Sequence, residues 1–220
     1  MIIPSIIPVM TLKGVVFFPD AMLPLRIFEE RYQKMLQDIL KSERMFAVVA
    51  ECENGSLKDG LEEPPFEVGT VGLVRVSKRN PDGTSFVMLQ GISRIRIKSI
   101  VQEFPYRLLK VEPFNTIETD GKLDIRKNIH DALLQNSKLG GEVTQEVLDY
   151  LGTIEDDVAF VDLASFTLCR STVRKQAMLE VQRLNKRAEM LFDDIMHQNL
   201  TLSLRRNGSD CNQNGEPDRN

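Results

Sequence analysis

The spacing of apolar residues changes near residue 115. Before that point, short apolar runs typical of β-strands are broken by Gly and Pro, whereas from about Lys122 apolar residues recur at helical spacing with few breakers. Residues 113–121 between the two parts are polar, as in a connector. The pattern predicts an α+β chain, with a β lobe over residues 1–115, a helical lobe over 122–204 and a disordered polar tail over 205–220.

The first part has the pattern of a strand-rich lobe with one helix. Residues 46–50 and 68–76 are predicted to be strands, and the turn residues of 80–83 predict a hairpin between Val76 and Phe86. One amphipathic helix interrupts the strands, because apolar residues fall on a single helical face. These residues are Tyr32, Met35, Leu36, Ile39 and Leu40.

The second part contains several helical stripes. Two short helices are predicted on either side of a Gly140-Gly141 break. The first stripe is Ile125, Ile129, Ala132 and Leu133, and the second is Val143, Val147, Leu148 and Leu151. Residues 158–169 are almost continuously apolar, which predicts a helix that is buried on most sides.

A long final helix is predicted to begin near Ser171 or Thr172 and to end near Leu204, because either hydroxyl can cap a helix start. Its apolar residues alternate in steps of four and three, which indicates a seam against a partner helix. The seam consists of Ala177, Val181, Leu184, Ala188, Leu191 and Ile195. Because the seam is short, a partner helix in the same chain is favoured over one in a second chain.

Composition places the chain among ordinary globular proteins. It has 220 residues, of which 42% are hydrophobic and 27% charged, and a formal net charge of −4. This charge gives no global attraction for phosphate backbones, so nucleic acid is a disfavoured partner. The sequence shows neither a basic leader followed by an apolar run nor about 18 consecutive apolar residues, which predicts a cytoplasmic protein without a membrane partner.

Candidate catalytic and metal-binding chemistry is sparse. Cys52, Cys169 and Cys211 are too far apart in sequence for a zinc pattern and are predicted to be free thiols, the first two buried. The two histidines, His130 and His197, lie in polar helical surroundings without a neighbouring nucleophile. No stretch matches the G-x-x-x-x-G-K-[ST] pattern that holds nucleotide phosphates. The sequence therefore predicts no enzyme activity and no cofactor.

Two acidic pairs and one C-terminal loop are candidate metal or acid–base sites. The pairs Asp156-Asp157 and Asp193-Asp194 diverge on a helix, which favours roles at helix starts or in solvent. Near the C-terminus, four residues and Gly215 match positions of a calcium loop, but the glutamate expected at position 12 is missing. The four residues are Asp210, Asn212, Asn214 and Asp218. A polar tail is the favoured interpretation, and no metal site is predicted.

An ordered set of motifs resembles the N-terminal, substrate-recognition domain of the Lon proteases. The set includes Phe17-Phe18-Pro19, the run from Pro24 to Glu29, Arg31-Tyr32, Val68 to Gly72, Pro81-Asp82-Gly83, Gly91, Arg94, Pro105-Tyr106, and Lys175-Gln176 with Leu179-Glu180, Arg183 and Leu191. The resemblance covers about residues 5–200. Asp20 departs from the family pattern, which has Gly there, and the acidic stretch 51–65 is particular to this chain.

The resemblance implies a β pseudo-barrel like that of PUA domains, followed by a helical lobe. It also implies a non-catalytic module that captures exposed apolar segments of unfolded polypeptides, since the ATPase and protease modules of complete Lon proteases are not found in these 220 residues. The predicted peptide contacts are bulky residues near strand ends, for which burial in the core is the competing interpretation. They are Phe17, Phe18, Met22, Phe66 and Tyr106.

Three charged residues, Arg26, Glu29 and Arg31, are predicted to be structural, with both arginines as candidates to pair with Glu29. Two other functions remain open, an adaptor or regulator of full-length Lon and an RNA-binding module that uses a basic face. That face would consist of Arg75, Lys78, Arg79, Arg94, Arg96 and Lys98. A solvated strand face is the ordinary interpretation of the last three.

Overall fold

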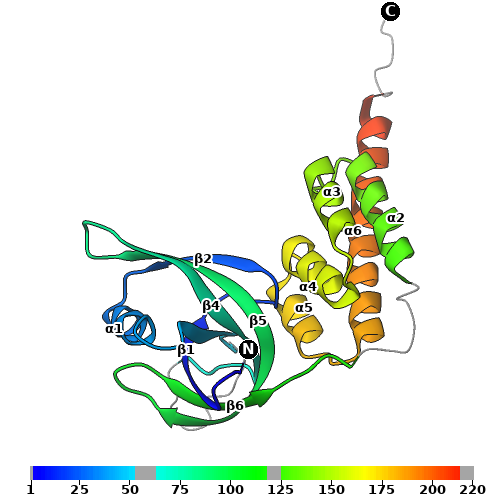
Figure 1. The fold of residues 1–220 in the computed structure, drawn as a ribbon. Helices are drawn as coiled ribbons and strands as arrows, with labels where there is room; N and C mark the ends of the chain where they lie inside the picture. Colours follow the sequence, from blue (N-terminus) through cyan, green and yellow to red (C-terminus); the bar gives the residue numbers. More distant parts are fainter. Residues whose placement is uncertain (1, 53–62, 118–124, 214–220) are drawn as a thin grey trace, which may run out of the picture. The chain divides into compact units, whose positions relative to one another are not determined.

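Contacts within the computed structural model divide the chain into two units. The structure describes residues 2–52, 63–117 and 125–213. We call Met1–Ile117 with Arg170–Gln182 the β unit, and Glu118–Cys169 with Arg183–Asn220 the helical unit. The mixed architecture confirms the predicted α+β class, and Figure 1 shows the elements of each unit along the chain.

The β unit is built on one six-stranded sheet. Its elements are β1 (Ile6–Leu12), β2 (Met22–Ile27), α1 (Glu30–Ile39), β3 (Met45–Ala50), β4 (Val68–Arg79), β5 (Ser85–Gln102), β6 (Leu108–Pro113) and α5 (Thr172–Leu179). The strand order is β2-β5-β4-β3-β1-β6, and β6 also pairs with β5. Five strands therefore form a closed circuit, as expected for the pseudo-barrel, and β2 pairs only with the first half of β5 (Figure 1).

Alternating residues of the strands fill the interior of this circuit. The core cluster includes Ile7 of β1, Ala47 of β3, Val71 of β4 and Ile95 of β5, each of which is fully buried. β3 is buried along its whole length, which is typical of a strand with both faces covered. Register shifts in β4 and β5 allow these long strands to curve around the circuit.

The predicted helix and hairpin of the β unit are both present. Helix α1 buries Tyr32, Met35, Leu36 and Ile39, the face that the periodicity predicts. At the hairpin, the backbone N–H of Asn80 donates to the Thr84 carbonyl, and Gly83 adopts a φ of +83° that favours glycine. The hairpin therefore follows from its turn residues.

The predicted single final helix is wrong in its first half. The structure has two helices, α5 in the β unit and α6 (Leu184–Gln213) in the helical unit. Ser171 caps α5 by accepting a bond from the Arg174 N–H, as predicted, but the helix ends at Leu179. The carbonyls of Leu179 and Val181 accept hydrogen bonds from the buried Arg94 guanidinium at 3.0 and 2.8 Å. These bonds stabilise an interrupted backbone, so Ala177 and Val181 are not part of α6.

The helical unit packs three helices and α6 against one another. They are α2 (Ile125–Lys138), α3 (Gln145–Thr153) and α4 (Asp157–Leu168). Helices α2 and α4 contact α6, whose seam residues Leu184, Ala188, Leu191 and Ile195 are buried, which confirms a partner within the chain. The Asn136 side chain donates to the Asn199 side chain at 2.8 Å and joins α2 to α6.

An ion pair lies in the core of the helical unit. Arg187 of α6 and Asp162 of α4 approach to 2.9 Å, and both side chains are fully buried. Burial lowers the pKa of Arg187, and the Asp162 carboxylate opposes that shift. The pair therefore fixes the register of α4 on α6 at the cost of desolvating two charges.

The backbone of α6 continues past its predicted end near Leu204 as far as Gln213. Asp210 and Asn212 of the calcium-loop pattern lie in this helical backbone, whereas Asn214, Gly215 and Asp218 lie outside the described residues. Of the cysteines, Cys169 is buried as predicted, but Cys52 is only half-buried. Most of the acidic stretch also lies outside the described residues, apart from its ends, where Glu51 pairs with Pro65.

Candidate functional site

An exposed apolar surface lies on β2, β5 and β4 of the β unit. The strand register places Pro24 opposite Met88, and Met88 opposite Val76. Opposite residues of paired strands share one face of a sheet, so these side chains form a row across three strands. Met22 lies on the same face of β2, two residues before Pro24, and Phe86 lies two residues before Met88 on β5.

We call Met22, Pro24, Val76, Phe86 and Met88 the apolar row. Its exposed members are substantially open to solvent, with 44% of Met22, 51% of Val76 and 38% of Phe86 accessible. The core of the sheet does not depend on these exposed side chains, because it is formed by other residues of the same strands, which point to the opposite face. A cluster of this kind marks an interaction site more often than scattered single residues do.

Cations flank the apolar row. The register places Arg26 and Lys78 on either side of Phe86, while the Nε of Arg75 donates to the Gln90 side chain at 2.6 Å. Arg26 pairs with Asp82 at 2.9 Å. Hydrogen bonds from the Thr84 hydroxyl and backbone N–H, followed by the charge of Arg26, lower the pKa of Asp82. Asp82 therefore stays ionised and orders the hairpin tip.

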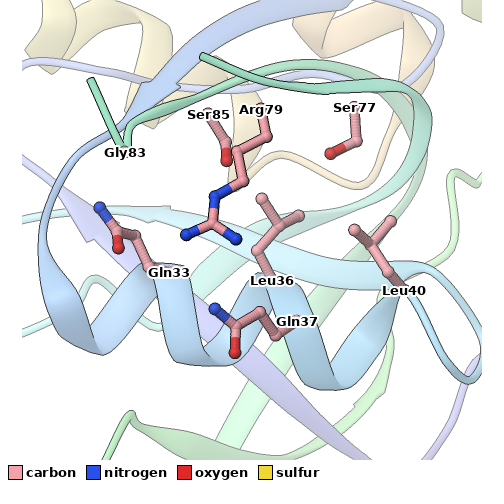
Figure 2. Close-up of a pocket in the computed structure, with 8 residues that line it drawn as sticks. All are labelled: Gln33, Leu36, Gln37, Leu40, Ser77, Arg79, Gly83 and Ser85. Carbon is pink, nitrogen blue, oxygen red and sulfur yellow. The ribbon is translucent and has the colours of Figure 1, made fainter. Parts of the chain in front are cut away.

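A groove lies on the other face of the same hairpin, between it and α1. It has a volume of about 110 Å³. Figure 2 shows the Arg79 side chain reaching from β4 toward α1, with its guanidinium directed toward Gln33, Leu36 and Gln37. The complete lining is Gln33, Leu36, Gln37, Leu40, Ser77, Arg79, Gly83 and Ser85.

The corner between β2 and α1 holds the other charged residues singled out from the sequence. Arg31 donates through Nε to Glu29 at 2.8 Å, which confirms one predicted pair, and through Nη2 to Glu63 at 2.7 Å. The predicted pair of Arg26 with Glu29 is wrong, because the outward face of β2 directs Arg26 to Asp82 instead. Hydrogen bonding to Glu63 raises the pKa of Arg31, while burial raises that of Tyr32 to about 12.

A second cavity beside this corner is too small for a ligand. Arg31, Tyr32 and Arg107 line it, with Val9, Thr11, Glu63 and Glu103. Its volume of about 20 Å³ accommodates no more than a water molecule. Arg107 donates there to Glu103 at 3.0 Å and to the Thr11 hydroxyl at 2.9 Å. These contacts fix β1 to the start of β6 and leave no binding site.

The predicted peptide contacts separate into two groups. Phe17 and Phe18 are fully buried, so their side chains are not available to a partner. Phe66 is half-buried against the core, and the Tyr106 hydroxyl donates to Asp38 of α1 at 3.0 Å. Met22 alone belongs to the exposed apolar row. The sequence analysis missed the other four members, although the alternation around the predicted hairpin was the signal that could have located Val76 and Phe86.

The predicted basic face is not a single face. Arg94 is only 2% exposed and donates to backbone carbonyls, which corrects the expectation of a solvated cation. Arg96 stacks on the Phe114 ring at 4.4 Å, and Lys98 pairs with Glu112 at 2.7 Å. Of the remaining three, Arg75 and Lys78 lie beside the apolar row, whereas Arg79 lies in the groove. This arrangement does not favour a phosphate-binding surface.

Three of the four residues in the acidic pairs have structural contacts. Asp156 caps α4 by accepting a bond from the Ala159 N–H at 2.7 Å, and Asp157 pairs with Arg126 at 2.6 Å. Asp194 accepts a bond from the Gln198 side chain. Within the described residues, no group of three or more metal-binding side chains gathers. Over the same residues, no helix has the length and apolarity needed to span a membrane.

Comparisons with known proteins agree on one family. The model of the ATP-dependent protease La (LON) substrate-binding domain matches residues 6–197. Lon protease 2 of Desulfotalea psychrophila is 28% identical over 201 residues, which cover 90% of this chain and 26% of that protein. The Lon protease of Clostridioides difficile is 27% identical, over 87% of this chain and 25% of its own length. The chain thus spans about a quarter of these relatives.

Two solved structures share the fold. A Lon N-terminal domain protein from Xanthomonas campestris has a TM-score of 0.65 and 19% identity, over 86% of this chain and 98% of its own. The N-terminal domain of the Mycobacterium avium complex Lon protease has a TM-score of 0.66 and 16% identity, over 87% and 98% respectively.

Proposed function

The chain belongs to the ATP-dependent protease La (LON) substrate-binding domain family, and on that premise we propose that it is a non-catalytic module that captures exposed apolar segments of unfolded polypeptides. The apolar row is the capturing surface. It supplies solvent-accessible Met, Val and Phe side chains on a rigid sheet, and burying such groups against a partner is favourable without any net positive charge.

The edge of β2 adds little backbone bonding to this capture. The Gly91 N–H donates to the Ala21 carbonyl, so residues 21, 23 and 25 turn their backbone groups toward β5. Residues 22, 24 and 26 then face outward, and Pro24 has no N–H to donate. A proline at this position weakens pairing with an added strand. Side-chain burial is therefore the main source of affinity in this proposal.

Binding of a permanently unfolded polypeptide tests the proposal. We expect the protein to bind a labelled, reduced and carboxymethylated protein with micromolar affinity, more tightly than single-stranded RNA at physiological salt, by fluorescence anisotropy. Polypeptide binding should persist as salt rises, because burial of apolar groups is not screened, whereas RNA binding should weaken steeply. RNA binding that is tighter at every salt concentration, without polypeptide binding, would overturn the proposal. Absence of both would favour an adaptor of full-length Lon.

A matched pair of variants locates the surface. Val76 of the apolar row and Val101 of β5 are both strand valines, 51% and 50% exposed. We expect Val76→Ser to weaken polypeptide binding about threefold to tenfold, since it removes apolar contact area, and Val101→Ser to leave it unchanged. Equal losses for both variants would show that the apolar row is not the binding surface.

An activity assay tests the proposal that the protein is non-catalytic. The described residues contain no cluster of three or more metal-binding side chains, and the 220 residues contain no phosphate-binding loop. We expect no hydrolysis of ATP or casein by the purified protein. Turnover above that of a preparation from cells with an empty vector would contradict this expectation.

A further inference from the structure

Arg79 is a cation without a carboxylate partner among the described residues. Its neighbour on the hairpin, Asp82, is bound by Arg26 and Thr84. The carboxylate of Asp38 on α1 is bound by Lys34 at 2.6 Å and by Tyr106. These two carboxylates are thus already occupied, and the Arg79 guanidinium faces neutral groups of α1.

The lining of the groove suits one particular kind of guest. Gln37, Ser77 and Ser85 offer hydrogen-bond donors from both walls, whereas the Gln33 amide already donates to the Phe28 carbonyl at 3.1 Å. Arg79 offers the planar fork that binds a carboxylate through two parallel bonds. Leu36 and Leu40 lie on the α1 side, where they can pack against methylene groups (Figure 2). A guest with a short apolar stem and an anionic end matches this combination.

The size of the groove points to a single side chain. Its volume of about 110 Å³ is several times the roughly 10–15 Å³ that one water molecule needs. It is well below the range of about 300–1,000 Å³ that is typical of small-molecule sites. A carboxylate carried on a polypeptide fits, whereas a nucleotide or a cofactor does not.

The edge of β4 provides a route between the apolar row and the groove. β4 pairs with β3 only as far as Leu73, and the Val74 N–H donates to the Arg44 carbonyl at 2.8 Å, so the edge from Arg75 to Arg79 has no strand partner on that side in the described structure. Val76 and Lys78 point to the face of the apolar row, whereas Ser77 and Arg79 line the groove. A bound chain that crosses this edge can occupy both surfaces.

We propose that the groove between α1 and the β4–β5 hairpin is a carboxylate subsite, which binds one acidic side chain, or the C-terminal carboxylate, of the polypeptide held by the apolar row. The inference rests on the proposed function and refines it. The preferred substrates are apolar segments that carry a carboxylate a few residues away, which Arg79 distinguishes from equally apolar segments without one.

Matched peptides test the subsite with the 220-residue chain. One labelled peptide carries an apolar core followed by Glu, a second has Gln at that position, and both are made with a free and with an amidated C-terminus. We expect the Glu peptide to bind about threefold to tenfold more tightly than the Gln peptide at low salt, a range set by a charge-assisted bond at an accessible site. If the terminal carboxylate is the guest, amidation rather than Glu→Gln should weaken binding by that factor. The preference should shrink as salt rises.

Variants assign the preference to the groove. Arg79→Gln should equalise the peptides without weakening the binding of the amidated Gln peptide, whereas Lys78→Gln, one residue away on the other face, should keep the preference. Wild-type protein that binds all four peptides equally overturns the subsite but leaves the proposed function intact. A preference that survives in Arg79→Gln also overturns it. Failure to bind any peptide overturns both.

Discussion

Single residues of this chain show how environment decides the role of a charge. Arg26, Arg79 and Arg94 have the same side chain, yet one pairs at the surface, one lies in a groove and one is buried against carbonyls. Asp20 shows the same for backbone conformation. It stands where the resemblance implies a glycine, and its φ of 61° lies in the left-handed region, where Asp is tolerated better than most residues. Asp20 is thus compatible with the backbone turn that precedes β2.

Tyr32 should make stability depend on alkaline pH. Burial raises its pKa to about 12 in the folded protein, whereas the phenol of the unfolded chain keeps an ordinary value near 10. Between these values the unfolded state loses the proton first, so the free energy of unfolding falls as pH rises. We expect urea midpoints to fall more between pH 9 and 11 for the wild type than for Tyr32→Phe. Parallel curves for the two proteins would contradict the shift.

The buried pair of Asp162 and Arg187 should be strongly coupled. Asp162→Asn or Arg187→Met alone leaves one charge buried without its partner, and each should lower the free energy of unfolding by about 3 to 5 kcal/mol. The double variant Asp162→Asn/Arg187→Met should recover much of that loss, because both charges are removed. Chemical denaturation of the four proteins measures the coupling, and additive losses would exclude it.

Regular elements could be predicted from the sequence where local pattern and tertiary structure agree. The face of α1 follows from its spacing, and the β4–β5 hairpin follows from Asn80 to Gly83. The end of α5 could not be predicted, because it depends on Arg94, which is 85 residues away from Leu179 in the chain. The apolar row could not be predicted either, because the pairing of Pro24 with Met88 is set by the strand register and cannot be read from either segment alone.

Arg94 should therefore control the end of α5. Arg94→Met removes bonds to the Leu179 and Val181 carbonyls and to the Thr116 hydroxyl at 2.6 Å. We expect a loss of about 2 to 4 kcal/mol in the free energy of unfolding, because buried acceptors lose a charged donor. Hydrogen exchange in α5 should accelerate more than in α2. Lys98→Met, on the same strand but exposed, should cost less than about 1 kcal/mol.

At the scale of the whole molecule, neither unit is a single continuous segment of the chain. The β unit uses residues on both sides of α2, α3 and α4, because Arg170–Gln182 returns to it. The predicted division into a β lobe over residues 1–115 and a helical lobe over 122–204 stays a prediction. Strand order likewise cannot be predicted from local spacing, since the parallel pairing of β1 with β3 joins segments about 38 residues apart.

The return of α5 predicts how fragments of the protein behave. A fragment of residues 1–117 lacks α5, whose buried Gln176 donates to the Val68 carbonyl at 3.1 Å and whose end binds Arg94. We expect this fragment to unfold at a lower urea concentration and with a shallower transition than residues 1–117 joined by a Gly/Ser linker to 170–182. The linked fragment restores both partners and should unfold cooperatively.

The matched control is the linked fragment with Gln176→Ala and Arg94→Met, which has the same length and linker but lacks both contacts. It should behave like residues 1–117 alone, because covalent attachment without these bonds does not dock α5. If residues 1–117 alone unfold with the same midpoint and slope as the linked fragment, α5 is dispensable to the β unit. That result would place the boundary of the β unit at Ile117, where the change in sequence pattern suggests it.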